Sequence, residues 1–111
     1  MIAAGRLRHR LLFQRPGYTY DEETNAQIAG WEDIGYIYCE VAPLSARELI
    51  AAQAEDSEVS LRVVIRYRSD ISSKCRILFR GKILNIHGVQ ADQVSGLEYL
   101  TLPCSEGLND G

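Results

Sequence analysis

The stretch Val59-Ser-Leu-Arg-Val-Val-Ile-Arg-Tyr67 decides the fold class, because its residue types alternate along the chain. Its odd positions are apolar or aromatic, and its even positions are Ser60, Arg62, Val64 and Arg66. A period of two is typical of a β-strand that buries one face. We therefore predict a strand over 59–67 whose odd residues, Tyr67 included, face a core.

The same alternation occurs on both sides of this strand. Downstream, Cys75, Ile77 and Phe79 alternate with Arg76, Leu78 and Arg80. Gly81-Lys82 then leads to residues 83–87, and we predict a tight hairpin there because glycine readily adopts a positive φ. Further strands are predicted over 7–13, 31–41 and 97–104. Pro103 predicts that the last of these lies at a sheet edge or is about to end.

One segment departs from the alternation and predicts a helix. Ser45-Ala46-Arg47-Glu48 has the spacing of a capping box, in which each of the two outer side chains accepts a hydrogen bond from the other residue's amide. Leu44 and Leu49 flank this box as a hydrophobic staple. We expect a helix that begins at about Ala46, runs for about three turns and frays by residue 56 or 57.

Residues 16–30 are predicted to form a long loop, which contains Tyr18, Tyr20 and the acidic run Asp21-Glu22-Glu23. Loops of this length often contact a partner or are mobile. The predicted fold is mainly β: a small antiparallel β-barrel of about six strands with one short helix between the second and third strands. We expect residues 1–111 to form a single domain of this kind.

The composition is that of an ordinary soluble domain. The chain has 111 residues, of which 46% are hydrophobic and 24% charged, and its net charge is -3. The longest apolar stretches have three or four residues, so no transmembrane segment is expected. Arginines close to the start argue against a signal peptide. The net negative charge argues against a protein built mainly to hold nucleic acid.

Residues with catalytic or metal-binding chemistry occur without a recognisable signature. The spacing of Cys39, Cys75 and Cys104 fits neither a disulfide framework nor a metal knuckle, and we expect reduced, buried thiols. His9 and His87 lie on different predicted strands and are expected to be structural. The acidic run 21–23 lacks the spacing of a calcium loop and is expected to be solvated. We predict no catalytic residue, no metal ligand and no cofactor; a hydrolase that uses a cysteine is the enzymatic alternative.

The charges are separated along the chain. Residues 17–58 contain ten acidic residues and one base, whereas residues 59–82 contain seven bases and one acid. By the alternation, four arginines point outward and form a basic stripe on two strands: Arg62, Arg66, Arg76 and Arg80. The stripe is open to three interpretations: a nucleic-acid surface, a contact between subunits of a ring, or a solvated sheet face. Nucleic-acid-binding barrels present stacking aromatics, and the predicted burial of Tyr67 and Phe79 argues against the first interpretation.

The order of short motifs along nearly the whole chain carries a resemblance to a known family. The motifs are Ala4-Gly5-Arg6-Leu7-Arg8-His9-Arg10, Gln14-Arg15-Pro16, an acidic loop ending at Trp31, Tyr38–Pro43, Leu44–Glu48, Arg66-Tyr67-Arg68 and Arg76–Gly81. In this order they resemble the head-tail joining proteins of tailed bacteriophages, also called head closure or head-tail adaptor proteins. Two positions depart from that family: Tyr38 stands where tryptophan is typical, and residues 90–93 match its usual turn only loosely.

The resemblance implies a β-barrel subunit without catalytic residues that forms a ring below the portal of a DNA-filled capsid. Such a ring closes the DNA channel after packaging and docks the tail. The implied partners are the portal or adaptor ring, tail proteins and other copies of this chain, while genomic DNA is retained without sequence-specific binding and no membrane is involved. The implied location is the head-tail connector of the virion, after assembly in the bacterial host cytoplasm.

Two site hypotheses and one alternative function follow. In that family the segment between the second and third strands can reach into the channel, and here it is residues 44–58. Its predicted channel-facing residues are Ser45, Arg47, Glu48, Glu55, Asp56 and Glu58. Because this segment is acidic, it would repel a DNA backbone. The arginine stripe is predicted to face a neighbouring subunit or ring. The alternative function is an OB-like barrel that binds nucleic acid.

Overall fold

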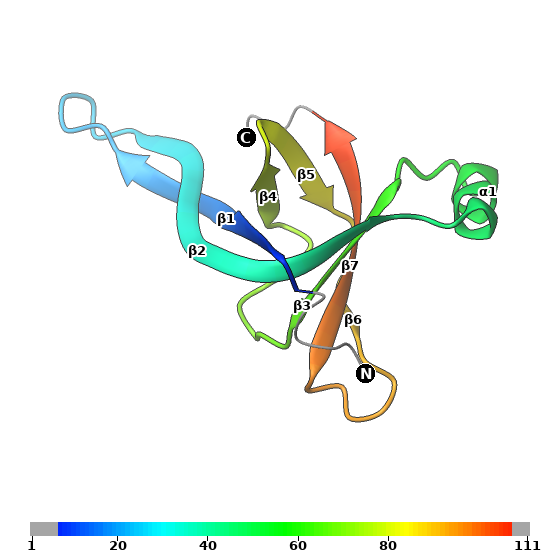
Figure 1. Cartoon of the computed structure of the whole chain (residues 1–111). Helices are drawn as coiled ribbons and strands as arrows, with labels where there is room; N and C mark the ends of the chain where they lie inside the picture. The colour runs from blue at the N-terminus through cyan, green and yellow to red at the C-terminus, as the bar shows by residue number, and fades with distance from the viewer. Residues whose placement is uncertain (1–6, 108–111) are drawn as a thin grey trace.

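The computed structural model describes residues 7–107, in which seven strands and one helix are present (Figure 1). In chain order they are β1 (His9–Tyr20), β2 (Gln27–Pro43), α1 (Ala46–Ala54), β3 (Leu61–Arg66), β4 (Arg76–Phe79), β5 (Lys82–Ile86), β6 (Gln90–Ala91) and β7 (Tyr99–Gly107). The first three residues of the resembling motif, Ala4 to Arg6, lie outside the described residues. Within the described range, no helix has the length and hydrophobicity that a bilayer crossing requires.

Six of the strands pair in a closed ring. The order is β3-β2-β1-β4-β5-β7, every pairing is antiparallel, and β3 also pairs with β7. The short strand β6 adds to β7 outside this ring. The predicted mainly β, six-stranded antiparallel fold is confirmed, as is the helix between the second and third strands.

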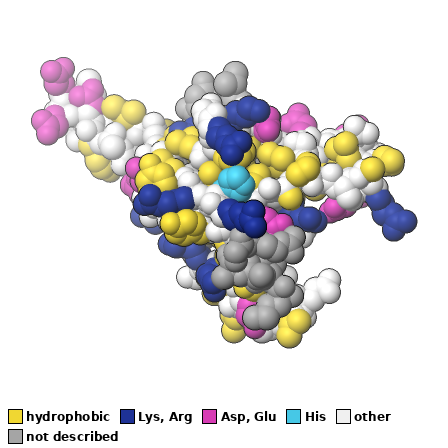
Figure 2. Space-filling model, in the orientation of Figure 1, with side chains coloured by type: hydrophobic (Ala, Val, Ile, Leu, Met, Phe, Trp, Pro, Cys, Tyr) yellow, Lys and Arg dark blue, Asp and Glu magenta, His cyan; other side chains and the backbone are white. Residues whose placement is uncertain are grey.

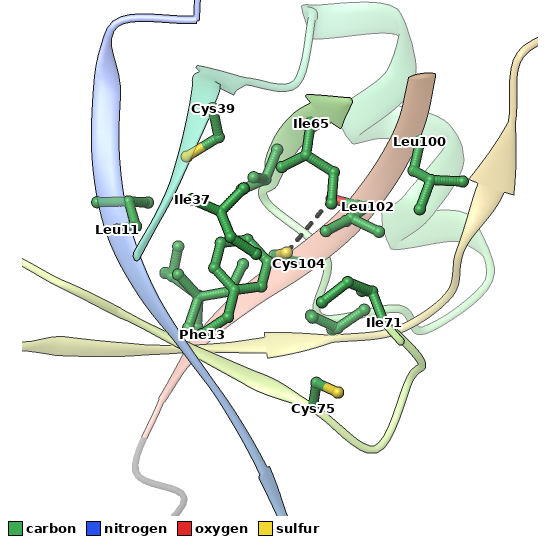
Figure 3. Close-up of a cluster of buried hydrophobic side chains, with 14 residues drawn as sticks. Leu11, Phe13, Ile37, Cys39, Ile65, Ile71, Cys75, Leu100, Leu102 and Cys104 are labelled. Atoms are coloured by element: carbon green, nitrogen blue, oxygen red, sulfur yellow. Dashed lines mark hydrogen bonds between the residues drawn. The ribbon is translucent and has the colours of Figure 1, made fainter. Parts of the chain in front are cut away.

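The interior of the ring is apolar, and the alternation of residues along each strand explains which side chains fill it. Five large side chains are fully buried: Phe13, Ile65, Ile77, Leu84 and Leu102. Figure 3 shows side chains from β1, β2, β3 and β7 converging on one cluster, with the thiols of Cys39 and Cys104 among them. The alternation predicted on each of these strands therefore selects the core. At about 25 cal/mol per Å² of apolar surface, this burial is the main stabilising term of the ring.

The strand that decided the fold class ends earlier than predicted. The side chains of Val63 and Ile65 are fully buried, as expected, but β3 ends at Arg66. The period therefore does not extend to Tyr67, which is 40% exposed, and the prediction of its burial is wrong. On the face predicted to point outward, Val64 is buried as well.

The hairpin between β4 and β5 is present, but its turn is Arg80-Gly81 rather than Gly81-Lys82. Phe79 pairs with Lys82, so that only two residues remain in the loop. Their φ angles are 51° and 78°, both in the left-handed region that two-residue hairpin turns of type I′ require. Arg80 therefore lies in a turn and not on the outward face of a strand.

The prediction that Pro103 marks a sheet edge or a strand end is also wrong. Pro103 lies in the middle of β7, opposite Arg62 of β3. Its carbonyl accepts a hydrogen bond from the amide of His87, 2.8 Å away, so its ring nitrogen faces the same side of β7. On that side β7 changes partner, from β6 at Thr101 to β5 at Cys104. A residue without an amide hydrogen is tolerated in this gap.

The predicted loop 16–30 is mostly a β-hairpin. Strands β1 and β2 stay paired from Pro16 with Trp31 out to Tyr20 with Gln27, and only residues 21–26 form the connection. We call residues 16–30 the arm. A register shift next to Phe13 marks a bulge, and Figure 1 shows that the hairpin beyond it extends away from the ring. The loop prediction fails because Pro16, Gly17 and Gly30 interrupt any local alternation, while the pairing itself is between distant residues.

Candidate interaction surfaces

The capping box at the start of α1 is confirmed. The Glu48 amide donates to the Ser45 hydroxyl at 3.2 Å, and the Ser45 amide donates to the Glu48 carboxylate at 3.1 Å. The hydrogen bond from the Ser45 amide, followed by the Ser45 hydroxyl and the nearby Arg62, lowers the pKa of the Glu48 carboxylate. The helix ends at Ala54, in agreement with the predicted fraying by residue 56 or 57, and Asp56 adopts a left-handed φ of 55°.

The segment 44–58 forms a projection, which we call the helical segment. No residue of α1 is buried, and Figure 1 shows the helix standing apart from the ring. All six residues predicted to face a channel are exposed on it: Ser45, Arg47, Glu48, Glu55, Asp56 and Glu58. Ile50 is 67% exposed on the same helix. The structure thus places these six residues together on one outlying element.

The four arginines of the predicted stripe do not form one surface. Arg62 and Arg66 lie on β3, whereas Arg76 lies on β4 and Arg80 in the turn after it. In the six-stranded ring, β3 and β4 are separated by β2 and β1 on one side and by β7 and β5 on the other. The expectation of a continuous stripe is therefore corrected to two arginine pairs on opposite sides of the ring. Strands that follow each other in sequence need not be neighbours in a sheet.

The pair on β3 borders the helical segment. Arg62 Nη1 lies 3.4 Å from Glu48 Oε2, which is an exposed ion pair of small energetic value. Arg66 is exposed and lines an open hollow of about 350 Å³ together with Tyr67, Glu98 and two neighbouring residues. These contacts place Arg62 beside α1 and leave Arg66 on a more open surface.

The pair on the other side is divided between two environments. Arg76 Nε donates to Gln14 Oε1 at 2.9 Å, and its guanidinium lies 4.2 Å from the ring centroid of Trp31. Arg76 therefore braces the base of the arm. Arg80 lies 5.1 Å from the ring centroid of Phe79 and is exposed at the hairpin turn.

The sequence interpretation missed a surface around the start of β1, which we call the basic-aromatic face. Its main residues are Arg10, Leu12, Tyr36, Leu78 and Arg80, and they line an open hollow of about 410 Å³. The guanidinium of Arg10 lies 4.6 Å from the ring centroid of Tyr36, which is 60% exposed. Arg10 and Leu12 alternate with the buried residues of β1, and this signal could have placed them outside. Their proximity to Arg80 depends on the pairing of β1 with β4.

A second missed feature is the loop 92–98, which Asp92 organises. Its carboxylate accepts hydrogen bonds from the amides of Ser95, Gly96, Glu98 and Tyr99, at 2.8 to 3.2 Å. These hydrogen bonds hold the pKa of Asp92 well below its usual range, and those from the Ser95 and Glu98 amides have the largest effect. The loop presents Val94, which is 94% exposed, and Leu97, which is 66% exposed. An aspartate followed by Ser95-Gly96 is the sequence signal for such a turn.

The cysteines and histidines occupy structural positions. Burial raises the pKa of Cys39 and of Cys104 to about 12, which keeps both thiols protonated and poorly nucleophilic near neutral pH. Cys75 is buried beside Ser72. The His87 ring lies 2.7 Å from the Ser105 hydroxyl, and His9 packs edge-on against Phe79. Within residues 7–107 no group of three potential metal ligands is present.

The fold and its surfaces define a class of protein. The described residues combine a packed apolar interior, two buried thiols of raised pKa and two projections whose charged and apolar side chains are exposed. These features suit a protein that works through contacts at its surface.

The comparisons with known proteins give the family. The phage head completion protein family matches residues 2–107. The head completion protein gp7 of Enterobacteria phage HK97 is 28% identical over 109 residues, which cover 93% of this chain and 95% of gp7. The head completion protein gp16 of Bacillus phage SPP1 is 29% identical over 96 residues, covering 84% of this chain and 85% of gp16. The chain belongs to the phage head completion protein family and is a structural protein of a phage virion.

Two solved structures share the fold. The solution structure of protein SF1141 from Shigella flexneri 2a has a TM-score of 0.76 and 31% identity, covering 98% of this chain and all of that one. A chain of the virion of a native gene transfer agent particle has a TM-score of 0.60 and 16% identity, with 92% of this chain and 96% of that chain covered. The second likeness is one of fold. The resemblance drawn from the sequence motifs is confirmed at the level of the family.

Proposed function

We propose that copies of this chain form a ring at the head-tail junction, close the DNA channel after packaging and provide the surface on which the tail docks. The observation that carries this proposal is the helical segment, which projects from the ring of strands and is exposed and largely acidic. Membership in the head completion family supports the location. In this proposal residues 1–111 act as one domain, and the partners are the portal or adaptor ring, the tail proteins and further copies of the chain.

The helical segment suits a channel lining because of its charge. Glu55, Asp56 and Glu58 follow the helix in close succession and are exposed. Facing a DNA backbone, they repel it, so that the segment lets DNA slide or blocks it sterically without binding it tightly. The six residues placed on this projection, Ser45 to Glu58, are the proposed channel-facing set.

The arginines serve as contacts to neighbours in this proposal. Arg62 and Arg66 on one side of the ring, and Arg76 and Arg80 on the other, suit a head-to-tail arrangement in which each subunit uses two different surfaces.

The function needs no catalytic group, and the raised pKa of Cys39 and of Cys104 argues against a cysteine hydrolase. We therefore propose that the protein is not an enzyme. Assembly in the host cytoplasm follows from the same proposal.

The test mixes the purified protein with its cognate portal ring and examines the mixture by electron microscopy. We expect a coaxial layer on the portal. The double variant Arg62→Glu/Arg66→Glu is expected to lose this layer or the subsequent joining of filled heads to tails, whereas Lys74→Glu, an exposed charge reversal on the loop before β4, is expected to retain both. A portal ring that stays bare with wild-type protein, or a normal yield of joined particles with the double variant, contradicts the proposal.

One observation favours a second candidate, a nucleic-acid-binding function. On the basic-aromatic face, Arg10 stacks on the exposed ring of Tyr36, and basic groups interleaved with aromatics are typical of single-strand binding surfaces. Filter binding of free DNA over a range of salt concentrations separates the two candidates. Affinity that is tight and falls steeply with salt supports nucleic-acid binding. Weak binding with no such slope supports the structural function.

A further inference from the structure

The arm carries apolar side chains that the described part of the chain leaves uncovered. Tyr18 is 61% exposed, Tyr20 68% and Ile28 50%. They lie on a two-stranded hairpin outside the ring, and a hairpin of two strands is at best marginally stable in water by itself. Figure 2 shows hydrophobic side chains along this projection. The arm therefore gains stability if another surface covers it.

The tip of the arm is acidic. Asp21, Glu22 and Glu23 occupy the turn between β1 and β2, and Figure 2 shows acidic side chains at the far end of the projection. The turn is shaped by the Glu23 amide, which donates to Asp21 Oδ1 at 3.0 Å, and by Asn25 with a φ of 57°. Glu22 and Glu23 are both exposed in this turn.

The basic-aromatic face lies at the opposite end of the same strand. Leu12 pairs with Leu78, and continuing this register brings Arg10 beside Arg80. The hollow there is lined by three arginines, Arg8, Arg10 and Arg80, and by no acidic side chain. Stacking of Arg10 on Tyr36 limits the freedom of its guanidinium, which lowers the entropic cost of binding a carboxylate.

These two charged features cannot meet within one molecule. Arg10 and Tyr20 are both on β1, and at about 3.3 Å per residue an extended strand separates them by roughly 30 Å. The strand is curved but continuous, and the long dimension of the molecule is 52 Å. The acidic tip and the basic face are therefore complementary only between two molecules, in a head-to-tail contact.

We propose that the acidic tip of one copy docks on the basic-aromatic face of a second copy of this chain, with Glu22 and Glu23 against Arg10 and Arg80. Tyr18 and Tyr20, which share one face of the arm, then lie along the neighbouring ring of strands. Because the two surfaces differ, each copy offers one of each, and the contact closes into a ring if the rotation between copies permits. The inference rests on the proposed ring, for which it names the contact.

The test uses two charge-reversed forms of the full chain. The tip variant is Glu22→Lys/Glu23→Lys, and the face variant is Arg10→Glu/Arg80→Asp; aspartate is chosen at residue 80 because it tolerates a positive φ. Assembly is measured by sedimentation velocity and by the layer formed on the portal ring. Each variant alone is expected to need at least about tenfold more protein for half-assembly, because like charges then face each other. Lys74→Glu is the matched control and is expected to assemble like the wild type.

Mixing the two variants gives the decisive result. A reversed tip fits a reversed face, and the remaining normal tip fits the remaining normal face, so an equimolar mixture is expected to recover assembly. The quadruple variant is expected to recover it as well. Folded variants that assemble normally alone, or a mixture of folded variants that fails to recover, overturn the proposal. A face variant that loses DNA binding while the tip variant assembles normally assigns the face to nucleic acid and also overturns it.

A cross-linking measurement separates this inference from the proposed function. In the variant Glu22→Cys/Tyr36→Cys, a disulfide can form only between copies, and the three native thiols are buried. We expect a ladder of disulfide-linked multimers at high protein concentration, even without a portal. A ladder together with a bare portal supports the contact and contradicts the head-tail function. A coaxial layer on the portal without a ladder contradicts the contact alone.

Discussion

The ring and the arm share strand β1, but different interactions stabilise each of them. The first part of β1 buries Leu11 and Phe13 among side chains from the other strands of the ring, whereas the outer part leaves Tyr18 and Tyr20 more than half exposed. One stretch of backbone hydrogen bonds therefore runs from a packed interior into solvent. The comparison teaches that strand pairing alone does not show where stability resides, and that a paired but uncovered hairpin is better suited to contact a partner than to support a fold.

The largest expected effect tests this difference with two aromatic residues of the same strand. Phe13→Ala removes a fully buried ring and is expected to lower the free energy of unfolding by about 3–5 kcal/mol. Tyr20→Ala removes an exposed ring from the arm and is expected to change it by less than about 0.5 kcal/mol. Urea denaturation of the purified protein at low concentration measures both values.

Should Phe13→Ala fail to fold, Phe13→Leu is expected to cost about 1.5 kcal/mol or less and keeps the comparison measurable. Equal losses at positions 13 and 20 would contradict the division of β1 into a supporting and an uncovered part.

A smaller and local effect is expected in the helical segment. Ser45→Ala removes the hydroxyl that accepts from the Glu48 amide, at a cost of about 1 kcal/mol to the helix. Because no residue of α1 is buried, this loss is expected to appear as faster amide hydrogen exchange over residues 46–54, with the unfolding midpoint of the ring unchanged. Ser69→Ala, on an exposed loop, is the control. A parallel drop in the midpoint would show that the helix supports the ring after all.

The parts of the fold that sequence reasoning predicted depend on short-range signals. The alternation of apolar and polar residues predicted the burial of Ile65, Ile77 and Leu102, because burial of one face imposes this alternation on each strand separately. The capping box predicted the start of α1, since both of its hydrogen bonds join residues three apart. These signals lie within a few residues of the element they describe.

The features that sequence reasoning missed depend on pairing between distant residues. The arm requires Pro16 to pair with Trp31, fifteen residues away, in the register set by the ring, and no residue type indicates that register. The predicted arginine stripe failed for the same reason, because β3 and β4 are consecutive in sequence but not adjacent in the sheet. The basic-aromatic face likewise arises only once Arg10 and Arg80 are brought together by the pairing of β1 with β4.

The smallest expected effect concerns the loop 92–98, which, like the arm, lies outside the core but is ordered by hydrogen bonds to the Asp92 carboxylate. Four amides donate to the Asp92 carboxylate and lower its pKa in the folded protein. A group whose pKa falls on folding stabilises the folded form above its unfolded pKa, and this stabilisation is lost as the pH falls through the folded value. The loop is therefore expected to stay ordered at neutral and mildly acidic pH and to loosen only in strong acid.

Carboxyl-carbon NMR of Asp92 checks this expectation, which is a titration midpoint below the unperturbed value of 3.8. Asp92→Asn keeps an oxygen acceptor but removes the charge, so the amides of Ser95 and Glu98 are expected to exchange faster near neutral pH, and the low-pH transition is expected to disappear. Signals from the ring are expected to stay unchanged in this variant. A normal midpoint, or loosening of the ring together with the loop, would mean that packing on the strands, and not Asp92, orders the loop. The loop would then resemble the ring, and not the arm, in what stabilises it.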